Sequence, residues 1–123
     1  MKISNPTARL GEDKACEFLK RKGYKIIERN FRRGYGELDI IATDPSARGG
    51  QVLVFVEVKT RSSDNFGTPF DAIAPWKLRP LIKTAQFYKM THKNLPEQMR
   101  IDAIGIDISG SELKIEHIEN ITS

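Results

Sequence analysis

The spacing of apolar residues predicts a helix near the beginning of the chain. Over residues 7–22, Ala8, Ala15 and Leu19 share one stripe, which is the period of a helix with one buried face. Gly23 follows directly and is expected to end this helix, because glycine accepts the positive φ found just after many helix C-termini.

A second helix is expected over residues 76–92, where Ala85 and Tyr88 fall on one side. Pro80 interrupts this pattern, and a proline inside a helix removes one backbone hydrogen bond. We therefore expect this helix to begin near Lys77 or to bend.

Five further segments are rich in strand-forming residues, at 24–31, 37–43, 52–61, 99–108 and 113–118. The third begins with apolar residues on both of its faces, which is typical of a central strand covered on two sides. Two helices and two hairpin-like pairs of strands predict an α/β sandwich around a mixed sheet. The length of 123 residues suits a single domain over residues 1–123.

Composition favours a cytoplasmic protein. Charged residues make up 29% of the chain, and no apolar run approaches the ~20 residues that span a bilayer, so no membrane association is expected. The N-terminal residues MKISNPTARLGED lack the apolar stretch of a secretory signal. Cys16 is the only cysteine, which excludes an internal disulfide.

The chain carries an excess of basic residues, with 20 Lys and Arg against 16 Asp and Glu and a net charge of +4. Such an excess attracts polyanions, although an ordinary solvated surface explains so small a charge about as well. The distribution is more informative, because basic residues cluster at Lys20–Lys22, at Arg32–Arg33, and at Lys77, Arg79 and Lys83 with helix-like spacing. We expect Arg33, Lys77, Arg79 and Lys83 to contact nucleic acid.

Two acidic residues and a lysine fall on neighbouring strands. Alternation along a strand places Glu57 and Lys59 on one face. If residues 37–43 and 52–61 form a hairpin, Asp39 and Glu57 are symmetric about Arg48 and lie opposite each other, with Cβ atoms about 4.5–5.5 Å apart. Two like charges on a mostly buried face repel each other, and a divalent cation between them would relieve that repulsion.

The chemistry of this arrangement is that of metal-assisted hydrolysis. Mg²⁺ favours carboxylate oxygens and keeps bound waters, one of which can become a nucleophile. The ammonium of Lys59 could orient or help to deprotonate that water. The alternative is a surface ladder of charges; the apolar residues Phe55 and Val58 beside the acids argue against full exposure.

Glu12 is a third acidic residue, and it falls on the apolar stripe of the first helix. A carboxylate is unfavourable there without a partner. Two explanations stand about equal: an outer metal ligand bonded through water, or a salt bridge to a basic residue at the edge of the helix.

Two sequence runs resemble the PD-(D/E)xK nuclease superfamily: Gly36-Glu37-Leu38-Asp39-Ile40-Ile41 and Val54-Phe55-Val56-Glu57-Val58-Lys59-Thr60-Arg61. With Gly11-Glu12 in the first helix, the chain is more closely similar to the YraN-like bacterial family of predicted endonucleases, which resemble archaeal Holliday-junction resolvases in fold. The likeness extends from about Arg9 to Asp107. Leu38 stands where the superfamily has its name-giving proline, a departure shared by many of its members.

The resemblance implies a restriction-endonuclease-like fold and a function for each candidate residue. Asp39 and Glu57 would be metal ligands, Glu12 would match the helix-borne acid of the resolvase-like members, and Lys59 would be the catalytic lysine. The cofactor would be a divalent metal ion, Mg²⁺ first and Mn²⁺ as the alternative. Arg61, on the face of Glu57 and Lys59, could hold a phosphate or form a salt bridge to Glu37 or Asp39.

Two functions therefore compete, beside a third in which the chain binds a partner protein and Asp39, Glu57 and Lys59 are structural. The first is a metal-dependent endonuclease acting on DNA, including branched or recombination intermediates. The second is a nucleic-acid-binding module that keeps the fold without cleaving. The acid pair favours the first, because carboxylates repel phosphate unless a metal intervenes. The sequence does not decide whether the partner is DNA or RNA. It also does not decide the oligomeric state, and a homodimer is one of the possibilities.

The remaining polar and aromatic residues of note are expected to serve structure. His92 lies at a helix end, where it can bond to the last carbonyls, and His117 is expected on the surface. Cys16 is expected in the core, Trp76 and Phe66 are expected to pack, and Asp102 is expected to bond to Arg100 or a loop.

Overall fold

Within the residues that the structure describes, two helices and five strands follow one another along the chain. The structure is a computed structural model that describes residues 6–34, 36–45, 50–62 and 75–122, with the backbone alone at 75–77. Its elements are α1 (Pro6–Arg21), β1 (Lys25–Arg33), β2 (Gly36–Asp44), β3 (Val52–Arg61), α2 (Pro75–Thr91), β4 (Met99–Asp107) and β5 (Lys114–Ile118). Every predicted helix and strand is present, and β3 has the predicted bounds.

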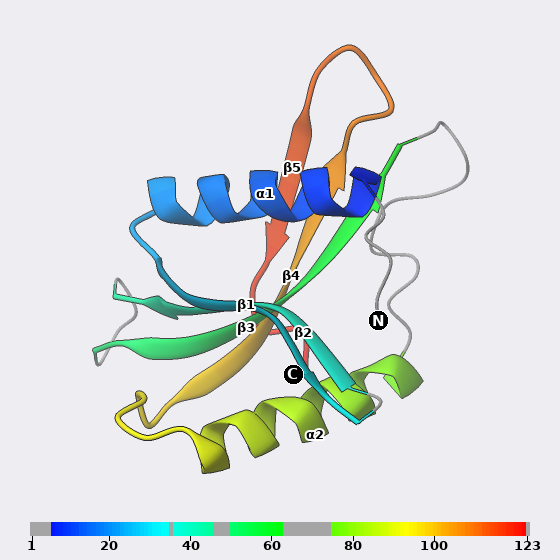
Figure 1. The fold of residues 1–123 in the computed structure, drawn as a ribbon. Helices are drawn as coiled ribbons and strands as arrows, with labels where there is room; N and C mark the ends of the chain where they lie inside the picture. Colours follow the sequence, from blue (N-terminus) through cyan, green and yellow to red (C-terminus); the bar gives the residue numbers. More distant parts are fainter. Residues whose placement is uncertain (1–5, 35, 46–49, 63–74, 123) are drawn as a thin grey trace.

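The strands form one mixed sheet in the order β1-β2-β3-β4-β5. Three neighbouring pairs are antiparallel, while β3 and β4 run parallel. A parallel pair needs a long crossover, and α2 lies on the segment that makes it. Helix α1 covers one face of the sheet and α2 covers the other (Figure 1). The predicted α/β sandwich with a central mixed sheet flanked by helices is confirmed.

Strand β3 occupies the middle of the sheet and contributes to two hydrophobic clusters. Val54 and Val56 pack with Leu19 of α1 on one side, whereas Phe55 packs with Tyr88 of α2 on the other. All three β3 side chains are at most 2% exposed. The prediction that this strand is covered on both faces is therefore confirmed.

The ends of the helices agree with the sequence in one case and differ in the other. Gly23 follows α1 with a φ of 92°, as expected of a residue that ends a helix. Helix α2 begins at Pro75, two residues before the start expected near Lys77, and the alternative of a bend at Pro80 stays a prediction. A proline is well suited to the first position of a helix, and burial of Ala85 and Tyr88 against the sheet stabilises the helix despite Pro80. No helix among the described residues is long and apolar enough to cross a membrane.

Each helix approaches the sheet closely at a glycine. A Cβ atom added to Gly11 of α1 would overlap the side chain of Thr60 on β3. A Cβ atom added to Gly36 of β2 would likewise overlap Thr84 on α2. Glycine permits these approaches because it has no side chain, and the first of them brings Glu12 to the end of β3.

Candidate active site

The candidate site forms where β2 leaves β3. The pairing of the two strands ends at Ile40 opposite Val56, in the register predicted from symmetry about Arg48. On the other side of β2, Asn30 of β1 has a φ of 58°, a conformation that few residues other than glycine adopt. Beyond this point the β1–β2 hairpin turns away from β3 towards α2 (Figure 1).

The side chain of Asp39 takes part in the sheet at this divergence. Asp39 Oδ2 accepts a hydrogen bond of 2.8 Å from the backbone N–H of Val58. If the pairing of β2 with β3 continued past Ile40 and Val56, that N–H would donate to a backbone carbonyl of β2. A carboxylate oxygen therefore replaces the backbone acceptor, and Asp39 is held beside the end of β3.

The carboxyl groups of Asp39 and Glu57 are close enough to influence each other's charge. Burial and the neighbouring Glu57 carboxylate raise the pKa of Asp39 to about 7. Burial also raises the pKa of Glu57, although the Lys59 ammonium opposes this from 3.6 Å away. The raised pKa of both acids means that two full negative charges are unfavourable here, so the pair favours a bound proton or a cation.

Three acidic residues border one hollow of about 340 Å³. Glu12 reaches it from α1, Asp39 from β2 and Glu57 from β3, and Thr60 lines it beside them. The close packing of Gly11 on Thr60 places α1 over the hollow. The sequence-predicted acids are thus brought together from three separate elements.

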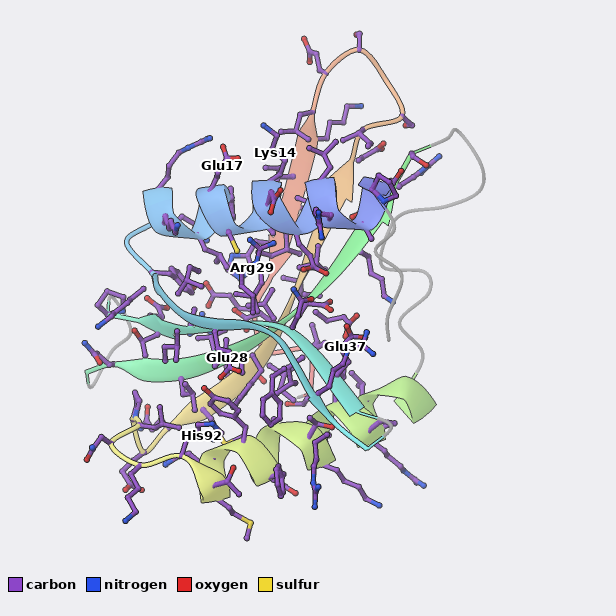
Figure 2. The ribbon with its side chains drawn as sticks, in the orientation of Figure 1. Lys14, Glu17, Glu28, Arg29, Glu37 and His92 are labelled. Carbon is purple, nitrogen blue, oxygen red and sulfur yellow. The ribbon has the colours of Figure 1, made fainter. Side chains whose placement is uncertain are left out.

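Glu12 is paired with a basic residue that sequence reasoning missed. Its Oε1 lies 3.6 Å from Arg29 Nη2, and the same nitrogen lies 2.8 Å from Asp13 Oδ1. Figure 2 shows Arg29 between α1 and the sheet, with Lys14 and Glu17 on the outer side of the helix. One of the two explanations for Glu12, a salt bridge at the helix edge, is confirmed. Among the described residues, no three His, Cys, Asp or Glu side chains form a ready metal-binding group.

A family model described as "Uncharacterised protein family UPF0102" matches residues 11–106, a range that includes Glu12, Asp39, Glu57 and Lys59. The chain belongs to this family. The YraN-like bacterial family that the motifs indicated is thereby confirmed.

Relatives from distant bacteria share this sequence over most of their length. A UPF0102 protein of Persephonella marina is 46% identical over 96 residues, which are 78% of each chain. A UPF0102 protein of Syntrophomonas wolfei is 43% identical over 111 residues, 89% of this chain and 91% of that one. The Flavobacterium psychrophilum protein FP2501 is 40% identical over 116 residues, 94% and 92% of the two chains.

One solved structure with a weaker likeness is that of Pyrococcus furiosus SfsA in complex with Ca²⁺. It aligns with 18% identity and a TM-score of 0.38, covering 92% of this chain. The chain spans only 64% of the length of SfsA. A TM-score of this size is too low to support an inference about function.

The basic residues predicted to contact nucleic acid separate into two places in the UPF0102 chain. Arg33, Arg79 and Lys83 line one pocket at the N-terminal half of α2. Arg61 instead lines a hollow at the β4–β5 turn beside Asp107. The side chain of Lys77 lies outside the described residues.

The UPF0102 chain also contains a buried polar network that the sequence did not predict as a whole. Asp102 of β4 is fully buried; it accepts hydrogen bonds from Arg100 Nε at 2.9 Å and from the backbone N–H of Asn120 at 2.9 Å. His117 Nε2 lies 2.9 Å from its other oxygen. Arg100 also donates to Tyr24 and Asp44.

The network corrects one expectation and confirms others. The His117 side chain is 4% exposed, so its predicted surface position is wrong, because Asp102 binds it from within. The expected bonds of Asp102 to Arg100 and to a loop are confirmed. The position of Cys16 in the core is also confirmed, as is the bond between His92 and the Tyr88 carbonyl at 3.0 Å. Phe66 and the side chain of Trp76 lie outside the described residues.

Burial is the largest influence on the pKa of Asp102 and acts to raise it, but the hydrogen bonds from His117 and Arg100 outweigh it and lower that pKa. Asp102 therefore stays ionised inside the protein. The signal that could have revealed this network is an acid between Ile101 and Ala103 in an apolar strand, since a buried charge requires partners.

Proposed function

We propose that this protein is a metal-dependent endonuclease of the PD-(D/E)xK type that hydrolyses phosphodiester bonds in DNA. Branched or recombination intermediates are the proposed substrates. The observation that carries the proposal is the partly buried acid pair of Asp39 and Glu57 with the ammonium of Lys59 beside it.

The donor set fits a divalent metal ion such as Mg²⁺ or Mn²⁺. Asp39 and Glu57 are carboxylates, the ligands that Mg²⁺ prefers, and their raised pKa values mean that this partly buried pair favours a compensating positive charge. Asp39 and Glu57 would hold the ion, and Glu12 would act on it through water from the same hollow. When bound, the ion would supply Lewis-acid charge and lower the pKa of a bound water.

The protein itself would position and neutralise the reacting groups. The Val58 N–H fixes the Asp39 carboxylate, so that it needs little rearrangement to bind a cation. Lys59, 3.6 Å from Glu57, would orient the attacking water and offset the negative charge that develops on phosphate. A side chain that positions a water or transfers its proton typically contributes about 10²–10⁴-fold to a rate.

One observation favours a second candidate, a nucleic-acid-binding module that does not cleave. Glu12 is engaged by Arg29, whose guanidinium lies 3.6 Å from the Glu12 carboxylate, so this acid already has a positively charged partner. In that case Arg33, Arg61, Lys77, Arg79 and Lys83 would bind phosphates, and the acid pair would be structural.

Cleavage assays distinguish the two candidates. Labelled single-stranded, duplex and four-way-junction DNA would be incubated with the protein in Mg²⁺, in Mn²⁺ and in EDTA. We expect cleavage with metal, none in EDTA, and none by Asp39→Asn. A folded protein that binds these DNAs and cuts none of them in either metal would establish the binding module instead.

A further inference from the structure

A second pocket lies away from the acids, between the tip of the β1–β2 hairpin and helix α2. It has a volume of about 330 Å³, within the range of about 300–1,000 Å³ typical of small-ligand sites. Three basic side chains border it, namely Arg33, Arg79 and Lys83, and none of the described residues that line it is acidic.

The floor of this pocket is apolar and aromatic. Pro80 and Phe87 of α2 line it, and the guanidinium of Arg33 lies over the Phe87 ring at 4.6 Å from its centroid. Within the described part of the chain, Arg79 and Lys83 are exposed and no ion pair is found for either. The nearest acid on β2, Glu37, is held by Arg32 at 3.1 Å. Among the described residues, the pocket therefore combines basic side chains that have no acidic partner with the apolar side chains of Pro80 and Phe87.

We infer that this pocket binds one unpaired nucleotide of the nucleic acid, with its phosphate between Arg79 and Lys83 and its base on the outer face of the Arg33 guanidinium, whose inner face lies over the Phe87 ring. Cations alone would suit any polyanion, duplex DNA included. A concave aromatic floor is reached only by a base that is out of a helix, and stacking on aromatic and Arg planes is the usual means of holding such bases.

This inference rests on the proposed function and narrows its substrate class to DNA with a single-stranded segment next to the cut. Gly36 lines the pocket, and Asp39 stands three residues further along β2. At about 3.3 Å per residue, the two lie roughly 10 Å apart, or about three nucleotide rises of 3.4 Å in a DNA strand. The packing of Gly36 on Thr84 fixes the pocket relative to the acids.

Binding measured by fluorescence anisotropy in EDTA tests the pocket without any cleavage. The probes are a labelled oligothymidylate and a labelled hairpin duplex without single-stranded ends. The double variant Arg79→Gln/Lys83→Gln should weaken binding of oligothymidylate and reduce the slope of log K against log salt by about 0.7, the value for the one phosphate that is no longer neutralised. The charge-matched control is Lys25→Gln/Lys93→Gln, both exposed and outside the pocket, which should leave most of the slope intact.

The stacked arrangement of Arg33 on Phe87 is tested by Phe87→Leu, which keeps an apolar side chain and removes the ring that holds the Arg33 plane. This variant should bind oligothymidylate about fivefold or more weakly, as the value of base stacking predicts, and should bind the duplex hairpin as the parent does. Its fold is checked by circular dichroism, because Phe87 also stacks on Phe31. If Phe87→Leu unfolds, the Gln double variant still decides the question of the pocket.

Several results would overturn the inference. The parent could bind no oligothymidylate, or polyglutamate could displace oligothymidylate from it as readily as unlabelled DNA does. The pocket and control double variants could lose the same affinity for oligothymidylate. The pocket variants could also lose as much affinity for the duplex hairpin as for oligothymidylate. Failure of the proposed function is separable from these. If the pocket variants lose single-strand binding but the protein cuts no DNA in Mg²⁺ or Mn²⁺, the nucleotide pocket is supported and the proposed nuclease function is refuted. If DNA is cleaved at the parent rate after substitution of Phe87 or Lys83, the nuclease function is supported and the role of the pocket is refuted.

Discussion

The carboxylate of Asp39 accepts the backbone N–H of Val58 at 2.8 Å, at the point where two paired strands separate. The acid thus takes the place of a backbone carbonyl. A side chain held by the sheet itself loses little freedom when it binds a ligand, which is the condition for a preorganised site. The same bond also keeps Asp39 next to Glu57, where neither carboxylate is well solvated.

The first prediction concerns the pH dependence of stability in EDTA. Asp39 has a raised pKa of about 7 in the folded protein, against about 3.9 when unfolded. Protonation therefore stabilises the fold fully below about pH 4, and this contribution is lost as pH rises through about 7. Asp39→Asn has no such proton and can still bond to both neighbours. At pH 8 the variant should be more stable than the parent by roughly 1 kcal/mol or more.

Urea titrations of parent and variant at pH 5 and pH 8 measure this effect. The free energy of unfolding of the variant should increase relative to that of the parent as pH rises from 5 to 8. A difference that is constant with pH, or a variant less stable at pH 8, would show that Asp39 is an ordinary ionised carboxylate.

The second prediction adds the metal to the same comparison. At tenfold excess over its dissociation constant, Mg²⁺ should stabilise the parent by about 1.4 kcal/mol by mass action. Asp39→Asn should gain much less, because it lacks one proposed ligand. Glu116→Gln, which changes an exposed acid of β5, is the control and should gain as much as the parent. Equal responses of all three proteins to Mg²⁺ would mean that the acids do not form a metal site.

The third prediction separates metal binding from chemistry. Lys59 is proposed to act on the attacking water, so Lys59→Met should keep the stabilisation by Mg²⁺ while turnover falls by about 10²–10⁴-fold. Lys114→Met removes an exposed lysine of β5 and should cleave like the parent. If Lys59→Met and the parent cut at the same rate, Lys59 has no part in the mechanism.

The sequence was sufficient to predict the parts of the site that depend on short-range geometry. Alternation along β3 and the symmetry of the hairpin about Arg48 give the register that the structure shows at Ile40 and Val56. These rules are reliable because a shift by one residue would move every apolar side chain of a buried strand to the wrong face.

The parts that escaped prediction depend on how distant elements approach one another. The ion pair of Arg29 with Glu12 forms only because α1 packs on β3 at Gly11 and Thr60. Neither local propensity nor charge pattern shows which basic residue faces a helix across a sheet. The burial of His117 has the same origin, since its partner Asp102 lies on a different strand.

The fourth prediction tests the close approach of α1 to the sheet. Gly11→Ala adds a Cβ atom that would lie 2.9 Å from Thr60 Cβ and overlap its hydroxyl. Overpacking of this kind destabilises by about 1–3 kcal/mol, and it should weaken cleavage as well, because Glu12 moves with the helix. Gly110→Ala is the control, since no atom lies within 4 Å of the added Cβ there.

Replacement of Thr60 by glycine in the Gly11→Ala background should recover part of the lost stability, because it removes the group that the new methyl meets. Thermal or urea unfolding of the four proteins provides the measurement. Equal stability of Gly11→Ala and Gly110→Ala would show that α1 has room to move.

The last prediction concerns the network around Asp102, which lies on β4 opposite Val56 of β3. Asp102 is fully buried and ionised, bound by Arg100, His117 and a backbone N–H. Asp102→Asn keeps the shape but removes the charge, so Arg100 is left partly buried with a weaker set of partners. Removing one member of a buried ion pair typically destabilises by about 3–5 kcal/mol, and a loss of that order is expected at pH 7.

The pH dependence of this loss distinguishes charge from shape. Because the folded pKa of Asp102 is lowered, its contribution is present above the unfolded value of about 3.9 and is lost as pH falls through the folded pKa. The difference in free energy of unfolding between the parent and Asp102→Asn should therefore become smaller as pH falls. For Asp39→Asn the stability relative to the parent changes in the opposite direction with pH. Asp107→Asn, the same substitution at the less buried end of β4, should have a far smaller effect at pH 7. If both variants lose the same stability, or the Asp102 gap persists unchanged at pH 3, the loss comes from packing and not from the ionised carboxylate.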